Sequence, residues 1–163
     1  MLAPTSAMTD AVRRAVGQIV DPEIPVLTIA DLGILRDVRI DDSGRVDIDI
    51  TPTYSGCPAL DVIRHDVEDC VRELGHPVTV NVVLAPAWTT DWMSDEGRRK
   101  LHEHGVAPPR RRDSGARLLE LEVACPVCNS AHTTEVAHFA STPCQALRRC
   151  TGCREPFQHF KEH

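Results

Sequence analysis

The stretch Thr-Tyr-Ser-Gly-Cys-Pro-Ala-Leu, residues 53–60, separates two segments with different hydrophobic periodicities. Residues 46–51 alternate apolar and polar side chains, which is typical of a half-buried β-strand. Residues 60–74 place their apolar side chains on one stripe at helical spacing, which predicts an amphipathic helix. Cys57 is therefore expected in a strand-to-helix turn, with Pro58 at the first helical position.

A cysteine in such a turn has two interpretations. Free backbone N–H groups and the positive end of the helix dipole would favour the thiolate of Cys57, making it a candidate nucleophile or soft metal ligand. The alternative is a small buried side chain in a tight turn. The upstream motif Asp21-Pro22-Glu23 holds two carboxylates on a proline-stiffened loop, although alone it also suits a solvated turn. We expect this loop beside Cys57, at the same end of the sheet.

The segments around this turn predict an α/β fold of the α+β kind. Two helices and three strands in the order helix, strand, strand, helix and strand would form a small mixed sheet with helices on one face. Besides the segments above, we expect a helix at 11–20 capped by Thr9, a strand ending at Ile40, a hairpin turn at 41–44, a strand at 78–84 and a further helix at 91–103.

Two Cys-x-x-Cys pairs near the C-terminus predict a structural metal site. Cys125 with Cys128, and Cys150 with Cys153, can each chelate from one knuckle, and two knuckles form a tetrahedral thiolate site. Zinc is the expected metal, with iron as the alternative. Cys144, between the pairs, stays open as a substitute ligand, a second reactive thiol or a packing residue.

A polar segment that begins with two prolines predicts the domain organisation. The segment after it is too short and polar to hold a core without metal. The expected parts are an N-terminal domain over residues 1–107, a linker over residues 108–117 and a zinc-ribbon module over residues 118–163.

Composition excludes several classes of function. A formal net charge of −6 argues against a general nucleic-acid binder, because phosphate contacts need a basic surface. The chain has no apolar run long enough to span a membrane and no N-terminal signal pattern, so a cytoplasmic protein is expected. No flavin, nucleotide or coenzyme A motif is present.

Three motifs together resemble the small domain of SufT-like iron–sulfur assembly factors. They are Asp-Pro-Glu-Ile-Pro at 21–25, Asp-Leu-Gly-Ile-Leu at 31–35 and Thr-Pro-Thr-Tyr-Ser-Gly-Cys-Pro at 51–58. Further segments and the cysteine-rich module narrow the resemblance to the PaaD family, also called PaaJ, which accompanies the phenylacetyl-CoA epoxidase of aerobic phenylacetate breakdown. These segments lie at 88–92, 105–109, 141–144, 154–157 and 159–161, and the resemblance covers nearly the whole chain after residue 10.

The resemblance implies an accessory protein that helps to mature the epoxidase system and is not itself the oxygenase. Its partners would be the oxygenase and reductase subunits of the epoxidase and the iron–sulfur assembly machinery. Cys57 would be a transient ligand to iron or an iron–sulfur cluster, or a thiol that exchanges with client cysteines. Asp21 and Glu23 would orient it or add oxygen ligands.

The alternative is a stoichiometric docking subunit of the oxygenase, in which the zinc ribbon makes the protein contact and Cys57 only packs. A thiol-dependent enzyme is the least favoured hypothesis, because no histidine is linked in sequence to Cys57 as an evident base. The oligomeric state stays open and includes a homodimer.

Overall fold

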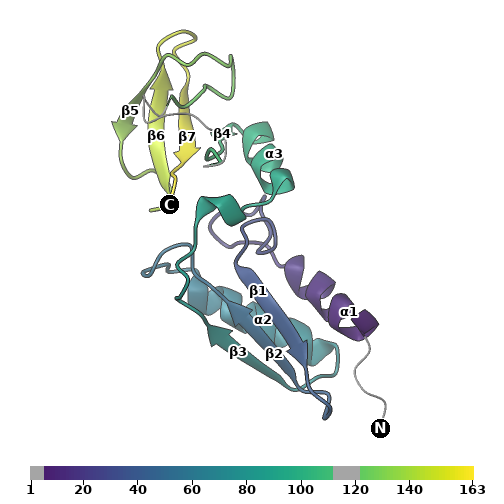
Figure 1. The fold of residues 1–163 in the computed structure, drawn as a ribbon. Coiled ribbons are helices and arrows are strands. Elements are labelled where there is room, and N and C mark those ends of the chain that lie inside the picture. The colour runs from purple at the N-terminus through teal and green to yellow at the C-terminus, as the bar shows by residue number, and fades with distance from the viewer. Residues whose placement is uncertain (1–5, 112–121) are drawn as a thin grey trace. The chain divides into compact units, whose positions relative to one another are not determined.

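The computed structural model describes residues 6–111 and 122–163, and its elements fall into two units, Met1–Trp88 and Thr89–His163 (Figure 1). The first unit has a three-stranded sheet in the order β1-β2-β3. Strands β1 and β2 are antiparallel and β2 and β3 are parallel, so the sheet is mixed, as predicted. The elements of this unit are α1 (Ser6–Gly17), β1 (Leu35–Ile40), β2 (Val46–Ile50), α2 (Leu60–Glu73) and β3 (Val78–Val82).

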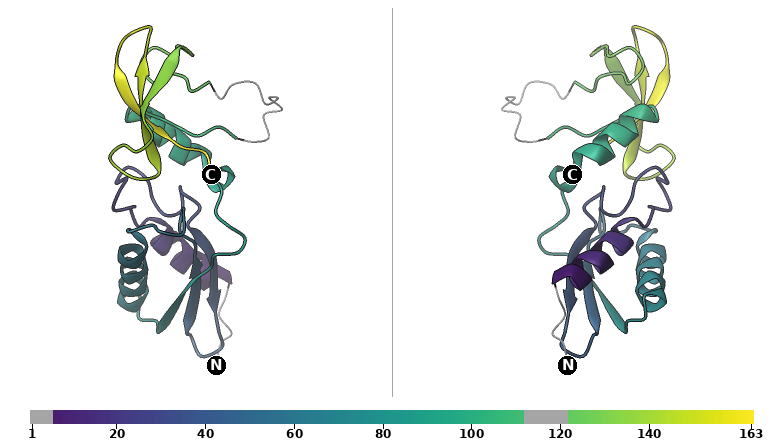
Figure 2. Two further views of the ribbon diagram at one scale, coloured as in Figure 1. Left: turned by 90° about the vertical axis from the view of Figure 1, so that its left-hand side faces the viewer. Right: turned by 90° about the vertical axis from the view of Figure 1, so that its right-hand side faces the viewer.

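The alternation in β2 decides which face of the sheet is covered. Val46, Ile48 and Ile50 are fully buried, whereas Asp47 and Asp49 between them are half-buried on the opposite face. Because successive side chains of a strand point to opposite faces, this pattern fixes one register. Helix α2 packs against β3, and α1 packs against both β1 and α2, so the helices enclose the apolar side (Figure 2).

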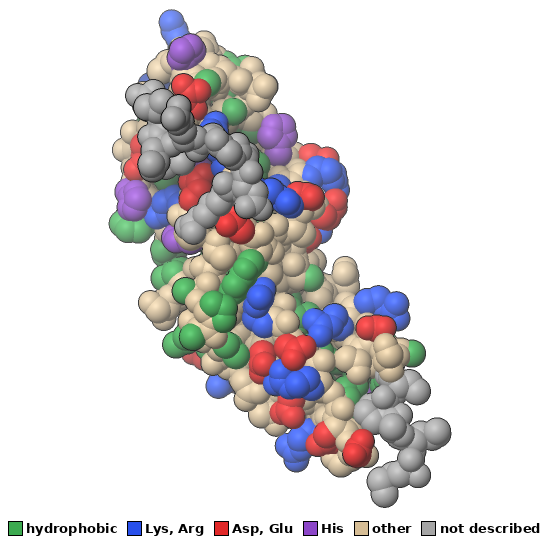
Figure 3. Space-filling view, viewed as in Figure 1, with side chains coloured by type: hydrophobic (Ala, Val, Ile, Leu, Met, Phe, Trp, Pro, Cys, Tyr) green, Lys and Arg blue, Asp and Glu red, His purple; other side chains and the backbone are tan. Residues whose placement is uncertain are grey.

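The other face of the sheet is charged. Acidic and basic side chains gather over β1 and β2 (Figure 3). Arg39 bridges Asp37 at 2.6 Å and Asp49 at 2.7 Å, and Asn81 of β3 also donates to Asp49. These side chains are partly exposed, where an ion pair contributes about 1 kcal/mol or less, so the charges keep this face in water more than they stabilise the fold.

Both helices of the first unit begin away from the expected residues. Thr9 lies inside α1, which starts at Ser6, and is not its N-cap. The chain leaves the helix after Gly17 because the carbonyl of Ile19 accepts from the N–H of Ile29 at 2.8 Å, an interaction that draws this segment into a loop. Helix α2 starts at Leu60, so Pro58 lies in the preceding turn and not at the first helical position.

The second unit contains a four-stranded sheet in the order β4-β7-β6-β5. Strand β4 is parallel to β7, and β7, β6 and β5 form an antiparallel meander. The expected helix at 91–103 is a 3₁₀ turn followed by a helix capped by Ser94, whose hydroxyl accepts from the N–H of Gly97. The elements are η1 (Thr90–Trp92), α3 (Asp95–Glu103), β4 (Val106–Ala107), β5 (Thr133–Ala137), β6 (Gln145–Cys150) and β7 (Pro156–Phe160).

This division of the chain differs from the expected domain boundary after residue 107. The physical reason is Ala107, which pairs with His159 of β7 and is buried in one core with Val123, Cys125 and Phe157. The segment before the expected linker therefore supplies a strand to the ribbon sheet. Of the expected linker, residues 112–117 lie outside the described part of the chain. Across the described ranges, no helix is long and apolar enough to cross a membrane.

Candidate functional site

The Cys57 turn is a short loop between β2 and α2 that holds the thiol half-exposed. The N–H of Cys57 donates to the carbonyl of Tyr54 at 3.1 Å, and the N–H of Leu60 donates to the carbonyl of Cys57. The backbone N–H of Ala59 and the side chain of Thr53 both hydrogen-bond to the sulfur. The turn therefore gives the sulfur two polar contacts while leaving part of it accessible.

Asp21 organises the acidic loop. Its side chain is buried, and Oδ1 accepts from the N–H groups of Glu23 and Ile24, both at 2.8 Å. The N–H of Asp21 in turn donates to the carbonyl of Leu27 at 2.9 Å. These contacts close the loop on both sides of Asp21, so its carboxylate has a structural role in addition to its charge.

The acidic loop and the Cys57 turn meet at one end of the first unit. The segment between them is fixed by the N–H of Thr51, which donates to the carbonyl of Ile34 at 2.9 Å at the end of β2. The charges of Glu23 and Asp21 both act on the Cys57 thiol and add to the effect of burial in raising its pKa. The predicted location of the acidic loop is therefore correct, while the roles assigned to these residues stay a prediction.

All three acidic groups of this site have raised pKa values. Burial is the main cause for the pKa of Cys57, followed by the opposing N–H of Ala59 and then by the charges of Glu23 and Asp21. Burial also raises the pKa of Asp21 against its two N–H contacts, and it raises the pKa of Glu23 together with the charge of Asp21. A cation between them would favour all three ionised forms at once.

Thr53 is the residue of this site that sequence reasoning missed. It is buried, and its side chain hydrogen-bonds to the Cys57 sulfur. The available signal was its place four residues before the cysteine in the same motif, because threonine hydroxyls commonly bond to nearby groups in turns.

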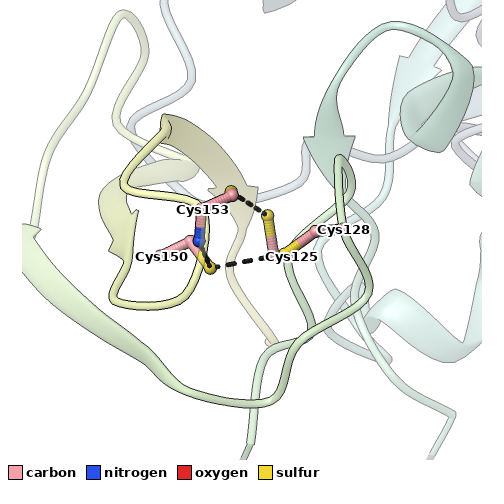
Figure 4. A group of neighbouring side chains, drawn as sticks. All are labelled: Cys125, Cys128, Cys150 and Cys153. Atoms are coloured by element: carbon pink, nitrogen blue, oxygen red, sulfur yellow. Dashed lines mark hydrogen bonds between the residues drawn. The ribbon is translucent and has the colours of Figure 1, made fainter.

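The second candidate site is the predicted group of four cysteines in the C-terminal unit (Figure 4). The sulfur atoms of Cys125, Cys128, Cys150 and Cys153 all lie within 4.8 Å of one another. Two of the separations are 3.7 Å, from Cys125 to Cys153, and 3.6 Å, from Cys128 to Cys150. A tetrahedral ion with metal–sulfur bonds of about 2.3 Å places its ligands roughly 3.8 Å apart, so the four residues fit zinc.

The two knuckles have the same backbone design. The residue after each second cysteine, Asn129 or Arg154, has a left-handed conformation, with φ of 59° and 69°. In the second knuckle the N–H of Cys153 donates to the sulfur of Cys150 at 3.4 Å, which lowers the pKa of Cys150. Both features turn the chain tightly around the sulfur atoms and favour the thiolate that a metal needs.

Cys144 lies outside this group. It is buried, and its sulfur is 3.0 Å from the hydroxyl of Thr142. Within the described residues, the group of potential ligands is complete with the four knuckle cysteines and includes neither Cys144 nor a histidine. Packing is therefore the interpretation of Cys144 that the structure favours.

Comparison with known families divides the chain in a similar way. Residues 9–83 match the family described as iron-sulfur cluster assembly protein, and residues 109–161 match the family described as PaaD zinc beta ribbon domain. The first match contains the acidic loop and Cys57, and the second contains all four knuckle cysteines.

Individual relatives cover either the whole chain or its first part. A protein of Escherichia coli (strain K12), described as belonging to 1,2-phenylacetyl-CoA epoxidase as one of its subunits, is 50% identical over 145 residues, which are 88% of this chain and 87% of that protein. The Fe-S protein maturation auxiliary factor YitW of Bacillus subtilis (strain 168) is 36% identical over 90 residues, covering 54% of this chain and 87% of that protein.

Solved structures resemble the first part of the chain. A domain of unknown function from Bacillus anthracis aligns with a TM-score of 0.55 and 28% identity, over 58% of this chain and 92% of that domain. A conserved hypothetical protein from Thermotoga maritima aligns with a TM-score of 0.51 and 29% identity, over 62% and 98%. With the E. coli relative matched over almost its full length, the chain belongs to the PaaD family, which joins an iron–sulfur cluster assembly domain to a zinc β-ribbon.

Proposed function

We propose that this protein is an accessory factor that matures an iron site or iron–sulfur cluster of a phenylacetyl-CoA epoxidase system. The E. coli relative carries the name of an epoxidase subunit, and the relatives of the first domain in B. subtilis and Staphylococcus aureus are named maturation auxiliary factors. The observation that carries the proposal is the convergence of Cys57 with the carboxylates of Glu23 and Asp21.

The chemistry of this site suits a cargo that must leave again. Cys57 would supply one thiolate to iron, and Glu23 and Asp21 would orient the cargo or add oxygen ligands. A single thiolate with two carboxylates holds iron less firmly than a set of cysteine ligands, because thiolates are the preferred ligands of iron–sulfur clusters. A client with more cysteines would therefore draw the cargo from this site.

The ribbon would hold zinc as a structural ion, with iron as the alternative metal. Zinc would join the two knuckles, and its binding free energy would contribute to the folding of β4–β7. We place the protein in the cytoplasm. The oxygenase and reductase subunits and the iron–sulfur assembly machinery are its partners in this proposal, and a homodimer is one oligomeric state that it permits.

Co-expression with the epoxidase tests this proposal. We expect Cys57→Ala to abolish the gain in client iron and acid-labile sulfide that the wild-type protein provides, without lowering the unfolding temperature by more than a few degrees. Cys70→Ala is the matched control, because Cys70 is also half-buried, beside the buried stripe of Ile63, Val67 and Val71 on α2. It should leave client loading unchanged.

The docking-subunit hypothesis gives the opposite result. Three large apolar side chains, Val127, Val136 and Phe139, are 59–65% exposed on the C-terminal unit, which suits a protein contact. If Cys57→Ala supports full loading and the protein stays with the oxygenase at fixed stoichiometry through gel filtration, docking is the function and the maturation proposal is wrong.

A further inference from the structure

The C-terminal unit contains a cavity of about 220 Å³ that the proposed function does not use. It lies between the end of α3, the segment after β4, the first zinc knuckle and the end of β7. The segments at 105–109 and 159–161, which contribute to the family resemblance without an assigned role, both supply lining residues. The lining that matters most consists of Ala107, Pro108, Pro109, Val123, His159 and Glu162.

A pair of polar side chains lies at one side of this cavity. His159 is 5% exposed, and its Nε2 atom is buried without a hydrogen-bond partner. The carboxylate oxygen Oε1 of Glu162 is 3.7 Å from Nε2, which is too long for a direct hydrogen bond. The same oxygen accepts from the N–H of Arg110 at 3.2 Å. A buried polar atom without a partner is costly, so a group that fills this gap would stabilise the pair.

The gap fits one oxygen atom that can both donate and accept. A hydroxyl placed between Nε2 of His159 and Oε1 of Glu162 reaches both at ordinary hydrogen-bond length. Burial alone would raise the pKa of Glu162, but the nearby His159 and the N–H of Arg110 lower it to about 2, so this carboxylate is an acceptor at neutral pH. A hydroxyl can donate to Glu162 and accept from His159, or donate to His159, whichever ring nitrogen carries the proton.

The remaining walls are apolar. Ala107, Pro109 and Val123 are buried, and Pro108 is half-buried beside them. A cavity of about 150 Å³ with apolar walls accommodates a benzene ring, so this larger cavity has room for a ring that carries one hydroxyl. Proline and aliphatic surfaces suit the face of such a ring.

We propose that this cavity receives the side chain of a tyrosine from a protein partner, with the ring between the prolines and Val123 and the hydroxyl between His159 and Glu162. The contact would anchor the C-terminal unit on its client by one buried aromatic group, which is a common form of hot spot at protein interfaces. This inference does not depend on the role proposed for Cys57, and its test measures binding alone.

The test uses the full-length, zinc-loaded protein with carbon-13-labelled histidine. p-Cresol, which has the structure of the tyrosine side chain, is titrated against toluene, which lacks only the hydroxyl, while the ring signals of His159 are followed by NMR. We expect saturable shifts with p-cresol and at least tenfold weaker binding of toluene, because toluene leaves the polar pair unsatisfied. N-acetyl-tyrosinamide should bind at least as tightly as p-cresol.

Variants separate a specific site from general affinity for aromatic rings. His159→Phe and Glu162→Gln should each reduce the preference for p-cresol over toluene to less than threefold, with zinc content retained as the check on folding. Glu162→Gln preserves shape and keeps the test valid if His159→Phe does not fold. His138→Phe, which changes an exposed histidine outside the cavity lining, should preserve the tenfold preference.

Three results would overturn the proposal. Equal binding of p-cresol and toluene would remove the role of the polar pair. A slowly exchanging water beside His159 with no saturable p-cresol binding would show that the cavity holds only water. Binding of p-cresol without binding of N-acetyl-tyrosinamide would assign the cavity to small phenols and not to a partner side chain.

Discussion

At the scale of single residues, the reactivity of Cys57 depends on the charge of the acidic loop. Burial raises the pKa of the thiol, and the charges of Glu23 and Asp21 raise it further. The N–H of Ala59 and the side chain of Thr53 oppose this without reversing it. In the cargo-free protein Cys57 is therefore mostly a thiol at neutral pH, and a cation is needed to make it a strong ligand.

We predict that Glu23→Gln makes Cys57 react faster with iodoacetamide. The substitution removes a negative charge that raises the pKa of the thiol, so the pKa falls and the thiolate fraction at any pH below it increases. The midpoint of the alkylation-rate profile should move to lower pH. The measurement is the rate of Cys57 labelling, read by peptide mass spectrometry across about pH 6–10, a range that brackets the ordinary pKa of a thiol.

Cys70 provides the control for this prediction. Its pKa is raised by burial and by the charge of Glu73. Glu73→Gln should therefore speed the labelling of Cys70 and leave Cys57 unchanged, while Glu23→Gln does the reverse. An unchanged Cys57 profile in Glu23→Gln would show that the acidic loop does not act on the thiol.

At the scale of secondary-structure elements, the zinc knuckles decide the fold of the second unit. Its core is small: Ala107, Val123 and Phe157 with the cysteines themselves. Such a core has little apolar area to offset the conformational entropy of the chain, so metal binding has to supply much of the folding free energy.

We predict that Cys150→Ser loses the bound zinc and unfolds β5, β6 and β7. Strand β4 should unfold with them, because its backbone pairs with β7. Elemental analysis and hydrogen exchange measure the two effects, and the amides of β1–β3 should keep their protection. Cys144→Ser is the matched control: it should retain a full equivalent of zinc, since Cys144 lies outside the sulfur group. Loss of zinc in the control, or retention in Cys150→Ser, would make Cys144 a ligand.

At the scale of the whole molecule, the chain is two units that meet at Trp88 and Thr89 in sequence. Trp88 belongs to the first unit: it is buried, and its indole N–H donates to the carbonyl of Leu32 at 2.8 Å. The buried residues Leu101 and Ala107 belong to the second. A cut after residue 107 would therefore separate part of the second unit from its partners.

We predict that residues 1–88 fold as an independent domain. Their amide spectrum should overlay that of the same residues in the full chain. A fragment of residues 1–107 should add signals from α3 and β4 that lack exchange protection, because β7 is missing. The prediction would be wrong if residues 1–88 were unfolded and the longer fragment were folded.

The local pattern of the sequence was sufficient for several features. The strict alternation of β2, the helical stripe of α2 and the spacing of the four knuckle cysteines are each encoded in a few neighbouring residues, and all three match the structure. The location of Asp21 and Glu23 beside Cys57 also followed, because the topology brings both loops to one end of the sheet.

Tertiary structure alone decided the features that depend on distant contacts. Strand β4 is two residues long, too short for a periodic signal, and exists because β7 pairs with it. The raised pKa of Cys57 reflects burial, which no local pattern reports. The gap between His159 and Glu162 arises from residues on either side of the end of β7 and from a cavity wall built by other segments of the unit. Short-range periodicity and spacing are local properties, whereas burial and cavity shape are set by packing across the whole unit.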